Sequence, residues 1–127
     1  DVVAEGARVG AVIGEAENGL GALSCDVEMG RAARKHSQDM CDQGYFDHTN
    51  LAGESPFDRM SEAGISYGAA AENIARGQPT ARVVHEAWMA SPGHRRNIMN
   101  ARLGRIGVGY VACPSGRPHY WTQVFAD

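Results

Sequence analysis

The sequence predicts an α+β domain in which helices cover a small antiparallel sheet. Apolar residues recur at helical spacing through much of the chain, whereas residues 106–110 and 120–125 alternate with a period of two. Strands and helices do not alternate as βαβ units, so a parallel sheet is not expected. With 127 residues, 43% hydrophobic and 21% charged, the chain has the size and composition of one globular domain, and we expect residues 1–127 to form it.

Two helices are predicted in the first third of the chain. Residues 2–17 carry apolar side chains at helical spacing, and Gly19 follows the end of the pattern. A second helix begins at Asp26 and stops at Gly44. Its apolar stripe comprises Met29, Ala33, His36 and Met40, with Ala32, Ser37 and Cys41 beside it. Because His36 lies on this stripe, we interpret it as a buried core histidine rather than as a ligand.

The middle of the chain alternates turns with short elements. Residues 45–53 form a turn-rich connection that carries His48. A Ser-Pro pair at 55–56 begins a short helix that ends at Gly64. Residues 67–75 are rich in small side chains and are expected to be a strand or an extended segment.

A further helix is predicted over residues 81–90, with Thr80 as its N-cap. Its expected apolar face consists of Val83, Val84, Ala87 and Trp88. His85 and Glu86 then lie on the solvated face. The HExxH zinc-protease motif fails here, because Met89 occupies the position of the second histidine.

Residues 88–99 are interpreted as the end of that helix, a break and a short second helix. Ser91 is expected to cap the new helix, and Pro92 takes a position where a missing N–H costs nothing. His94 falls in the first turn, next to Arg95 and Arg96. A histidine close to the positive end of a helix and to two cations should resist protonation. A neutral imidazole can ligate a metal or act as a base; the alternative is a hydrogen bond to a neighbouring loop.

The C-terminal third is predicted to be a hairpin. The alternating segments 106–110 and 120–125 are its strands, and residues 114–117 are its loop. His119 follows this loop, beside Pro118, and is expected to be exposed.

Composition excludes some classes of partner. A net charge of −3 gives no support for nucleic acid or an anionic membrane as a partner. No apolar run has the length of a membrane span. The first residues lack the basic start and apolar core of a signal peptide, although a mature chain from which it had been removed would look the same.

The three cysteines have no CxxC spacing, so a structural zinc knot is not expected. Two states of the cysteines therefore remain possible: one disulfide with one free thiol, or three thiols. The first requires an oxidising compartment. Cys25 and Cys41 lie near opposite ends of one predicted helix, roughly 24 Å apart, and cannot pair. Any bridge must therefore use Cys113, and we favour Cys25 as its partner.

Three chemically useful side chains lie at breaks between the predicted elements: His48, Glu72 and His94. We expect them to converge on one surface cleft. Two imidazoles and one carboxylate could ligate a metal, or serve as a base with its orienting partner.

The order and spacing of several motifs resemble the CAP superfamily, which includes cysteine-rich secretory proteins, venom antigens and plant pathogenesis-related proteins. The motifs are His36-Ser-Gln-Asp-Met40, Tyr45-Phe-Asp-His-Thr-Asn50, Ser55-Pro-Phe-Asp-Arg-Met60, Ala71-Glu-Asn-Ile-Ala75, Trp88 through Asn97, Ile106-Gly-Val-Gly109 and Tyr120-Trp-Thr-Gln-Val-Phe125. The resemblance implies a three-layer α-β-α sandwich with a surface cleft, in a bacterial protein of the branch that carries the SPGHR sequence.

The resemblance also implies which residues line the cleft. Eukaryotic members use two histidines and two glutamates; His48, Glu72 and His94 match three of them. The position of the second glutamate is Ser91 here, and Glu86 lies on the wrong face of its helix to replace it. The sequence leaves open whether either residue takes that role.

The resemblance implies a secreted protein whose signal peptide has been removed, but no single reaction. We favour a binding module in which His48 and His94 hold a divalent metal, zinc foremost, and the cleft takes a small or extended ligand. That partner would be a small molecule, a lipid or a cell-surface ligand, and the protein a monomer. One alternative is a metal-assisted, peptidase-like hydrolase in which Glu72 positions water; another is an interaction domain whose cleft is only structural. Whether the protein is an enzyme is left open.

Overall fold

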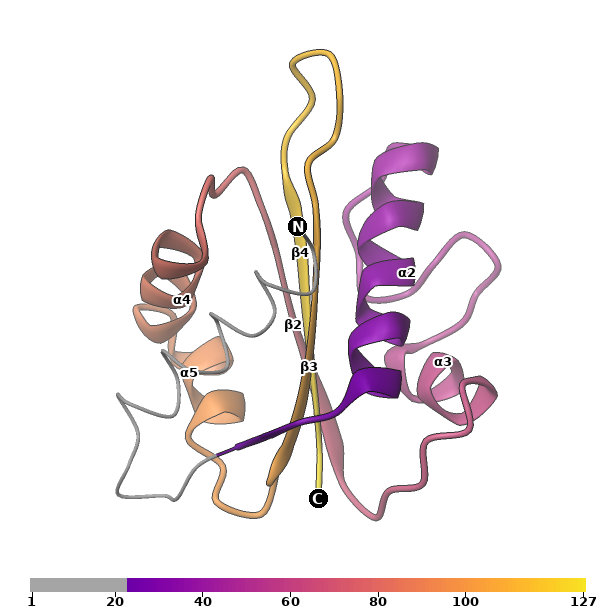
Figure 1. The fold of residues 1–127 in the computed structure, drawn as a ribbon, viewed down its shortest axis with the longest axis vertical. Helices are drawn as coiled ribbons and strands as arrows, with labels where there is room; N and C mark the ends of the chain where they lie inside the picture. Colours follow the sequence, from indigo (N-terminus) through magenta and orange to yellow (C-terminus); the bar gives the residue numbers. More distant parts are fainter. Residues whose placement is uncertain (1–22) are drawn as a thin grey trace.

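The computed structural model describes residues 23–127, and in it two layers of helices enclose a central sheet (Figure 1). The helices are α2 (Val27–Gln43), α3 (Pro56–Glu62), α4 (Ala81–Met89) and α5 (Pro92–Ile98). Helices α2 and α3 lie on one side of the sheet, and α4 and α5 on the other. The predicted α+β class and three-layer sandwich are confirmed. The helix predicted over residues 2–17 lies outside the described residues.

The sheet has the strand order β1-β3-β4-β2. Its strands are β1 (Ser24–Cys25), β2 (Ala70–Arg76), β3 (Arg105–Val111) and β4 (Tyr120–Ala126). Strands β2, β3 and β4 pair in antiparallel fashion, as predicted, and β3 and β4 form the expected hairpin. The two-residue β1 was not predicted; it pairs with β3 in parallel, because the backbone before α2 runs beside the start of β3.

Both faces of β4 are covered, so every residue of that strand is buried. Successive side chains of a strand point to opposite faces. Trp121 and Phe125 therefore pack on the α4 side, in a cluster with Val84 and Trp88. Val124 packs on the α2 side, in a second cluster with Met29, Ala33, Met60, Ile65 and Ala126.

The predicted helix ends are confirmed for α2 and α3. The Asp26 carboxylate accepts a hydrogen bond from the Met29 amide at 3.0 Å, and Gly44 ends α2 with a φ of 72°. Ser55 and Asp58 form a reciprocal capping box at the start of α3. This box fixes the direction of α3 and hence of the side chains on its later turn.

Two local predictions about α4 and α5 were wrong. His85 is buried, 6% exposed, on a face with Ala81, Val84 and Trp88, whereas Val83 is 43% exposed. The predicted face and the buried face both have helical spacing. The face that contains His85 is the one that packs against the sheet. Ser91 holds the N-cap position of α5, but its side chain makes no capping hydrogen bond. Pro92 begins α5, as predicted, but it does not explain the missing bond, because Ser55 caps α3 ahead of Pro56 in the same arrangement.

The disulfide joins Cys41 to Cys113, and Cys25 is free and exposed, so the favoured Cys25–Cys113 bridge was wrong. The reason is the register of the sheet. Cys25 pairs with Ile106 near the start of β3, whereas Cys113 follows the other end of that strand, roughly 20 Å away at 3.3 Å per residue. The C-terminal end of α2 lies beside the hairpin there, which brings Cys41 within reach.

Candidate functional site

The candidate site is built around the edge strand β2. Glu72 and Asn73 are consecutive, so their side chains point to opposite faces of the sheet. Glu72 meets groups from the α2–α3 layer, and Asn73 meets α5. Residues from both helical layers therefore meet at this edge of the sheet.

The Glu72 carboxylate is buried and fully engaged. Its side chain is 1% exposed, and Oε1 lies 2.8 Å from Nδ1 of His48. Arg59 donates to both oxygens, from Nη1 to Oε2 at 3.1 Å and from Nη2 to Oε1 at 3.3 Å. A buried carboxylate needs such partners to remain charged.

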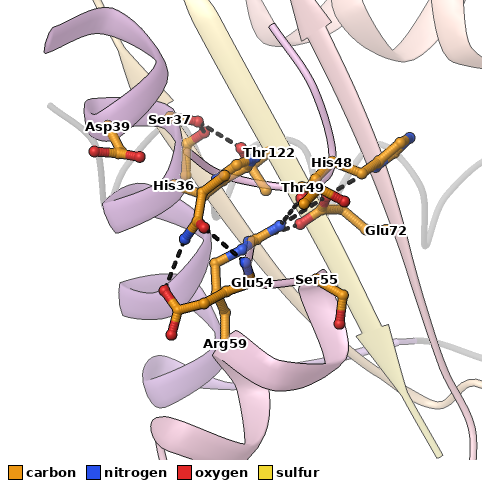
Figure 2. A network of polar contacts seen from close by, with 12 residues as sticks. His36, Ser37, Asp39, His48, Thr49, Glu54, Ser55, Arg59, Glu72 and Thr122 are labelled. Atoms are coloured by element: carbon orange, nitrogen blue, oxygen red, sulfur yellow. Dashed lines mark hydrogen bonds and ion pairs between the residues drawn. The ribbon is translucent and has the colours of Figure 1, made fainter. Parts of the chain in front are cut away.

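Arg59 is a further residue of the candidate site, and the sequence pattern did not indicate it. It extends from α3 between the carboxylate and the loop that carries His48, where Nη2 also donates to the His48 carbonyl oxygen at 2.5 Å (Figure 2). A signal was present, because Arg59 lies within the Ser55–Met60 motif that contributes to the family resemblance. Its distance of 13 residues from Glu72 gave no indication that the two side chains meet.

A buried amide network holds α5 against β2. Asn73 Nδ2 donates to the carbonyl oxygen of His94 at 3.1 Å and to Oε1 of Gln123 at 3.0 Å. Asn97 Nδ2 donates to Oδ1 of Asn73 at 2.8 Å. Asn73 and Gln123 are fully buried. The network therefore sets the position of the His94 backbone, and the sequence reasoning assigned it no role.

The environments of the two site histidines shift their pKa values in opposite directions. The hydrogen bond to Glu72 raises the pKa of His48 above its ordinary value, and burial only partly opposes this. Burial lowers the pKa of His94, and the nearby His48 lowers it further. His94 thus resists protonation as predicted, but through burial and His48 rather than through Arg95 and Arg96.

The structure brings His48 and Glu72 into contact, and places His94 within electrostatic reach of His48. Glu86 is exposed on α4, as predicted. Within residues 23–127, no hydrogen bond joins the side chain of Ser91 or of Glu86 to these three residues, so the missing family glutamate has no replacement through a direct contact.

The remaining histidines lie outside this group. His36 is buried, 1% exposed, and its Nε2 lies 2.8 Å from the Asp47 carbonyl oxygen, which confirms the core interpretation. His119 is only half-exposed, because its ring stacks on Tyr110 and its Nδ1 lies 2.6 Å from the Tyr110 hydroxyl.

The donor set fits a metal only in part. Within the described part of the chain, no group of three or more His, Cys, Asp and Glu side chains could hold a metal ion. Glu72 is occupied by its two partners, which leaves Nε2 of His48 and the ring of His94 as candidate donors. A carboxylate bonded to the other nitrogen of a ligating histidine is a common arrangement around metals. The described residues therefore offer two imidazoles at most and no closed set of metal ligands.

Comparison with known proteins gives a consistent assignment. The model of the cysteine-rich secretory protein family (CAP) matches residues 6–125. The uncharacterized protein YkwD of Bacillus subtilis (strain 168) is 50% identical over 109 residues, which are 86% of this chain and 41% of that protein. An extracellular protein containing a SCP domain from Bacillus anthracis has a crystal structure with a TM-score of 0.86 at 25% identity, covering 98% of this chain and 41% of that one. The chain spans about two fifths of the length of both relatives.

A more distant likeness concerns NaASP2, whose crystal structure was determined with Zn²⁺. Its TM-score is 0.57 at 16% identity, over 82% of this chain and 59% of that one, which shows a common fold. Among the helices of residues 23–127, none is both long and apolar enough to cross a membrane.

Proposed function

The chain belongs to the cysteine-rich secretory protein (CAP) family, and we propose that residues 1–127 form one secreted binding domain of a longer protein, with a divalent-metal site at His48 and His94. Zinc is the metal that two imidazoles and open coordination positions suit best. The open positions would take water or a donor group of a small-molecule, lipid or cell-surface ligand.

One observation supports this proposal above the others: Glu72 holds Nδ1 of His48 at 2.8 Å. With Glu72 accepting, Nδ1 carries the proton, and the neutral ring presents its Nε2 lone pair outward. The His48 side chain is 48% exposed, so the imidazole is open to solvent. The bond to Glu72 thus orients the imidazole before any metal arrives.

The same contact favours binding over hydrolysis. A general base needs a free lone pair within reach of the water that it activates. Both Glu72 oxygens are already hydrogen-bonded, one of them to two partners, and the Arg59 guanidinium neutralises the carboxylate. Glu72 is therefore better suited to positioning His48 than to taking a proton, and the metal-assisted hydrolase is the second candidate.

Secretion has independent support. The Cys41–Cys113 disulfide is stable in an oxidising compartment, and the Bacillus anthracis relative is described as extracellular. The cleft would then work outside the cell, where free zinc and surface ligands are its potential partners.

We expect His48→Ala and His94→Ala each to abolish most of the zinc affinity, because each removes one of two imidazole donors. Glu72→Gln should do less, a loss of about 10–100-fold, because it disturbs only the group that orients His48. Calorimetric titration with ZnCl₂ measures these affinities, with His119→Ala as the matched histidine control. Equal zinc affinity in the parent and all four variants would refute the metal site. If the parent hydrolyses a peptide or ester from a test panel and Glu72→Gln abolishes that turnover, the hydrolase is supported.

Zinc affinity should also depend on pH in a defined direction. Protons compete with the metal for His48, whose pKa lies above its ordinary value. Zinc affinity should therefore begin to fall above pH 6.5 as the solution is acidified.

The stability of the metal-free protein should change with pH in the opposite direction. Protonated His48 stabilises the fold through Glu72, fully below about pH 6.5, and this contribution is lost as the pH rises through the raised pKa. Melting temperatures of the metal-free parent and His48→Ala should therefore converge at high pH; a constant difference would contradict the assignment.

A further inference from the structure

Strand β2 contacts both histidines of the proposed metal site. The Glu72 side chain, on the α2–α3 face, lies 2.8 Å from Nδ1 of His48. The next residue, Asn73, points to the other face and donates from Nδ2 to the carbonyl oxygen of His94 at 3.1 Å. Helix α5, which carries His94, lies on the opposite side of the sheet from α2 and α3 (Figure 1). Two consecutive residues of one strand therefore hold the two candidate ligands, one from each side of the sheet.

The two histidines are held in different ways. Glu72 fixes the His48 ring itself, and Arg59 donates to the His48 carbonyl oxygen at 2.5 Å. Within residues 23–127, by contrast, no hydrogen bond joins the ring of His94 to another residue. The bond between His94 and β2 is made by the His94 backbone. The position of the His94 imidazole therefore follows from the position of the α5 backbone.

Two asparagines fasten α5 to β2. Helix α5 has only seven residues, of which Ile98 is buried. Asn97, in the last turn of α5, donates from Nδ2 to Oδ1 of Asn73 at 2.8 Å, and the same nitrogen lies 3.4 Å from the Glu72 carbonyl oxygen. Asn97 thus joins α5 to both residues of β2 that hold the candidate ligands.

These amide bonds define where α5 lies. Asn73 is fully buried, and Gln123 accepts a second hydrogen bond from its Nδ2 at 3.0 Å. A buried polar group that loses its partner costs free energy, so the helix is held where the bonds are made. A metal requires its donor atoms within a few tenths of an ångström of their ideal distances. Apolar contacts alone are not directional and would hold α5 less exactly.

We propose that Asn73 and Asn97 are positioning residues of the metal site, because they fix α5, and with it His94, against the strand that orients His48. The inference rests on the proposed function, in which His48 and His94 bind zinc. It follows that replacing either asparagine weakens zinc binding although no donor atom of the metal is removed.

The test uses Asn97→Leu, which has a similar volume but cannot donate. Asn97 is half-buried, so the variant is expected to fold. In the metal-free protein, NMR should show the ring signals of His94 shifted and those of His48 unchanged. Calorimetric titration with ZnCl₂ should give an affinity about tenfold below that of the parent, which is the lower end of the loss found for residues that support a metal ligand.

Two control variants separate positioning from a general loss of stability. Ser91→Ala changes the N-cap residue of α5, whose side chain makes no capping hydrogen bond. Gln123→Met removes the other bond of Asn73 Nδ2 but leaves the bond from Asn73 to α5. Both variants should keep the His94 signals and the zinc affinity of the parent, and Gln123→Met should lower the unfolding midpoint alone.

A double variant gives a readout that a change in stability does not move. In a His94→Ala background, Asn97→Leu should cause no further loss of the residual zinc affinity, because the side chain that Asn97 positions is absent. This residual affinity is measured from the shifts of the His48 ring signals during a ZnCl₂ titration.

Shifted His94 signals in Asn97→Leu, together with no further loss in the His94→Ala background, would support the proposal. Unchanged His94 signals in Asn97→Leu, a further tenfold loss in the His94→Ala background, or an equal loss of zinc affinity in Gln123→Met would overturn it. If the parent binds no zinc, the proposed function fails instead, and the metal-free His94 signals of Asn97→Leu still decide whether Asn97 positions His94.

Discussion

Gly109→Ala should destabilise the protein by at least about 3 kcal/mol, the upper range for overpacking a core, because the new methyl group would meet backbone atoms of α2 rather than a flexible side chain. A Cβ at this position would lie 2.1 Å from the Arg34 amide nitrogen and 2.3 Å from the Arg34 Cα. These are backbone atoms in the middle of α2, so relief requires the helix to shift away from β3. Since a small domain has only about 5–15 kcal/mol of stability, such a shift threatens folding itself.

Chemical denaturation monitored by circular dichroism measures this effect. Gly107→Ala should behave similarly, because its Cβ would lie 2.3 Å from the Met29 carbonyl carbon. Gly104→Ala is the matched control, since nothing lies within 4 Å of its added methyl group. Equal stability of Gly109→Ala and Gly104→Ala would show that α2 does not pack on β3 as closely as the structure indicates.

Removing the disulfide should have the next largest effect on the free energy of unfolding. The Cys41–Cys113 bridge closes a loop with a sequence separation of 72 residues. In the chain-entropy treatment a loop of this length contributes about 4 kcal/mol, so the Cys41→Ser/Cys113→Ser variant should lose about 2–4 kcal/mol. The bridge also joins α2 to the end of the β3–β4 hairpin, where the Arg117 guanidinium donates to the Cys41 carbonyl oxygen.

Denaturant unfolding of the double variant, with Cys25→Ser as the matched control, checks this expectation. Cys25 is free and exposed, so its replacement should leave the unfolding midpoint unchanged. Thiol titration of the unreduced parent should find one reactive group; three would refute the bridge and weaken the case for secretion.

The elements were largely predictable because each depends on neighbours in sequence. The Asp26 cap, the stripe from Met29 to Met40 and the left-handed Gly44 determine α2 within a single segment. The alternation along β3 and β4 likewise needs no long-range information. Helix α4 and its Thr80 cap were predicted, but its buried face was not, because two faces with helical spacing were available. Strand β1 was missed because two residues carry no periodicity.

The pattern of the chain alone thus determined the helices and the hairpin, and the family motifs indicated His48, Glu72 and His94. Tertiary structure decided which of these groups touch. Glu72 contacts Arg59 and His48, His94 is held through its backbone by Asn73, and Cys113 pairs with Cys41 rather than Cys25. The physical reason is that helix caps and hydrophobic periods act over a few residues, whereas a buried carboxylate or thiol takes its partner from whichever layer the sheet register brings beside it.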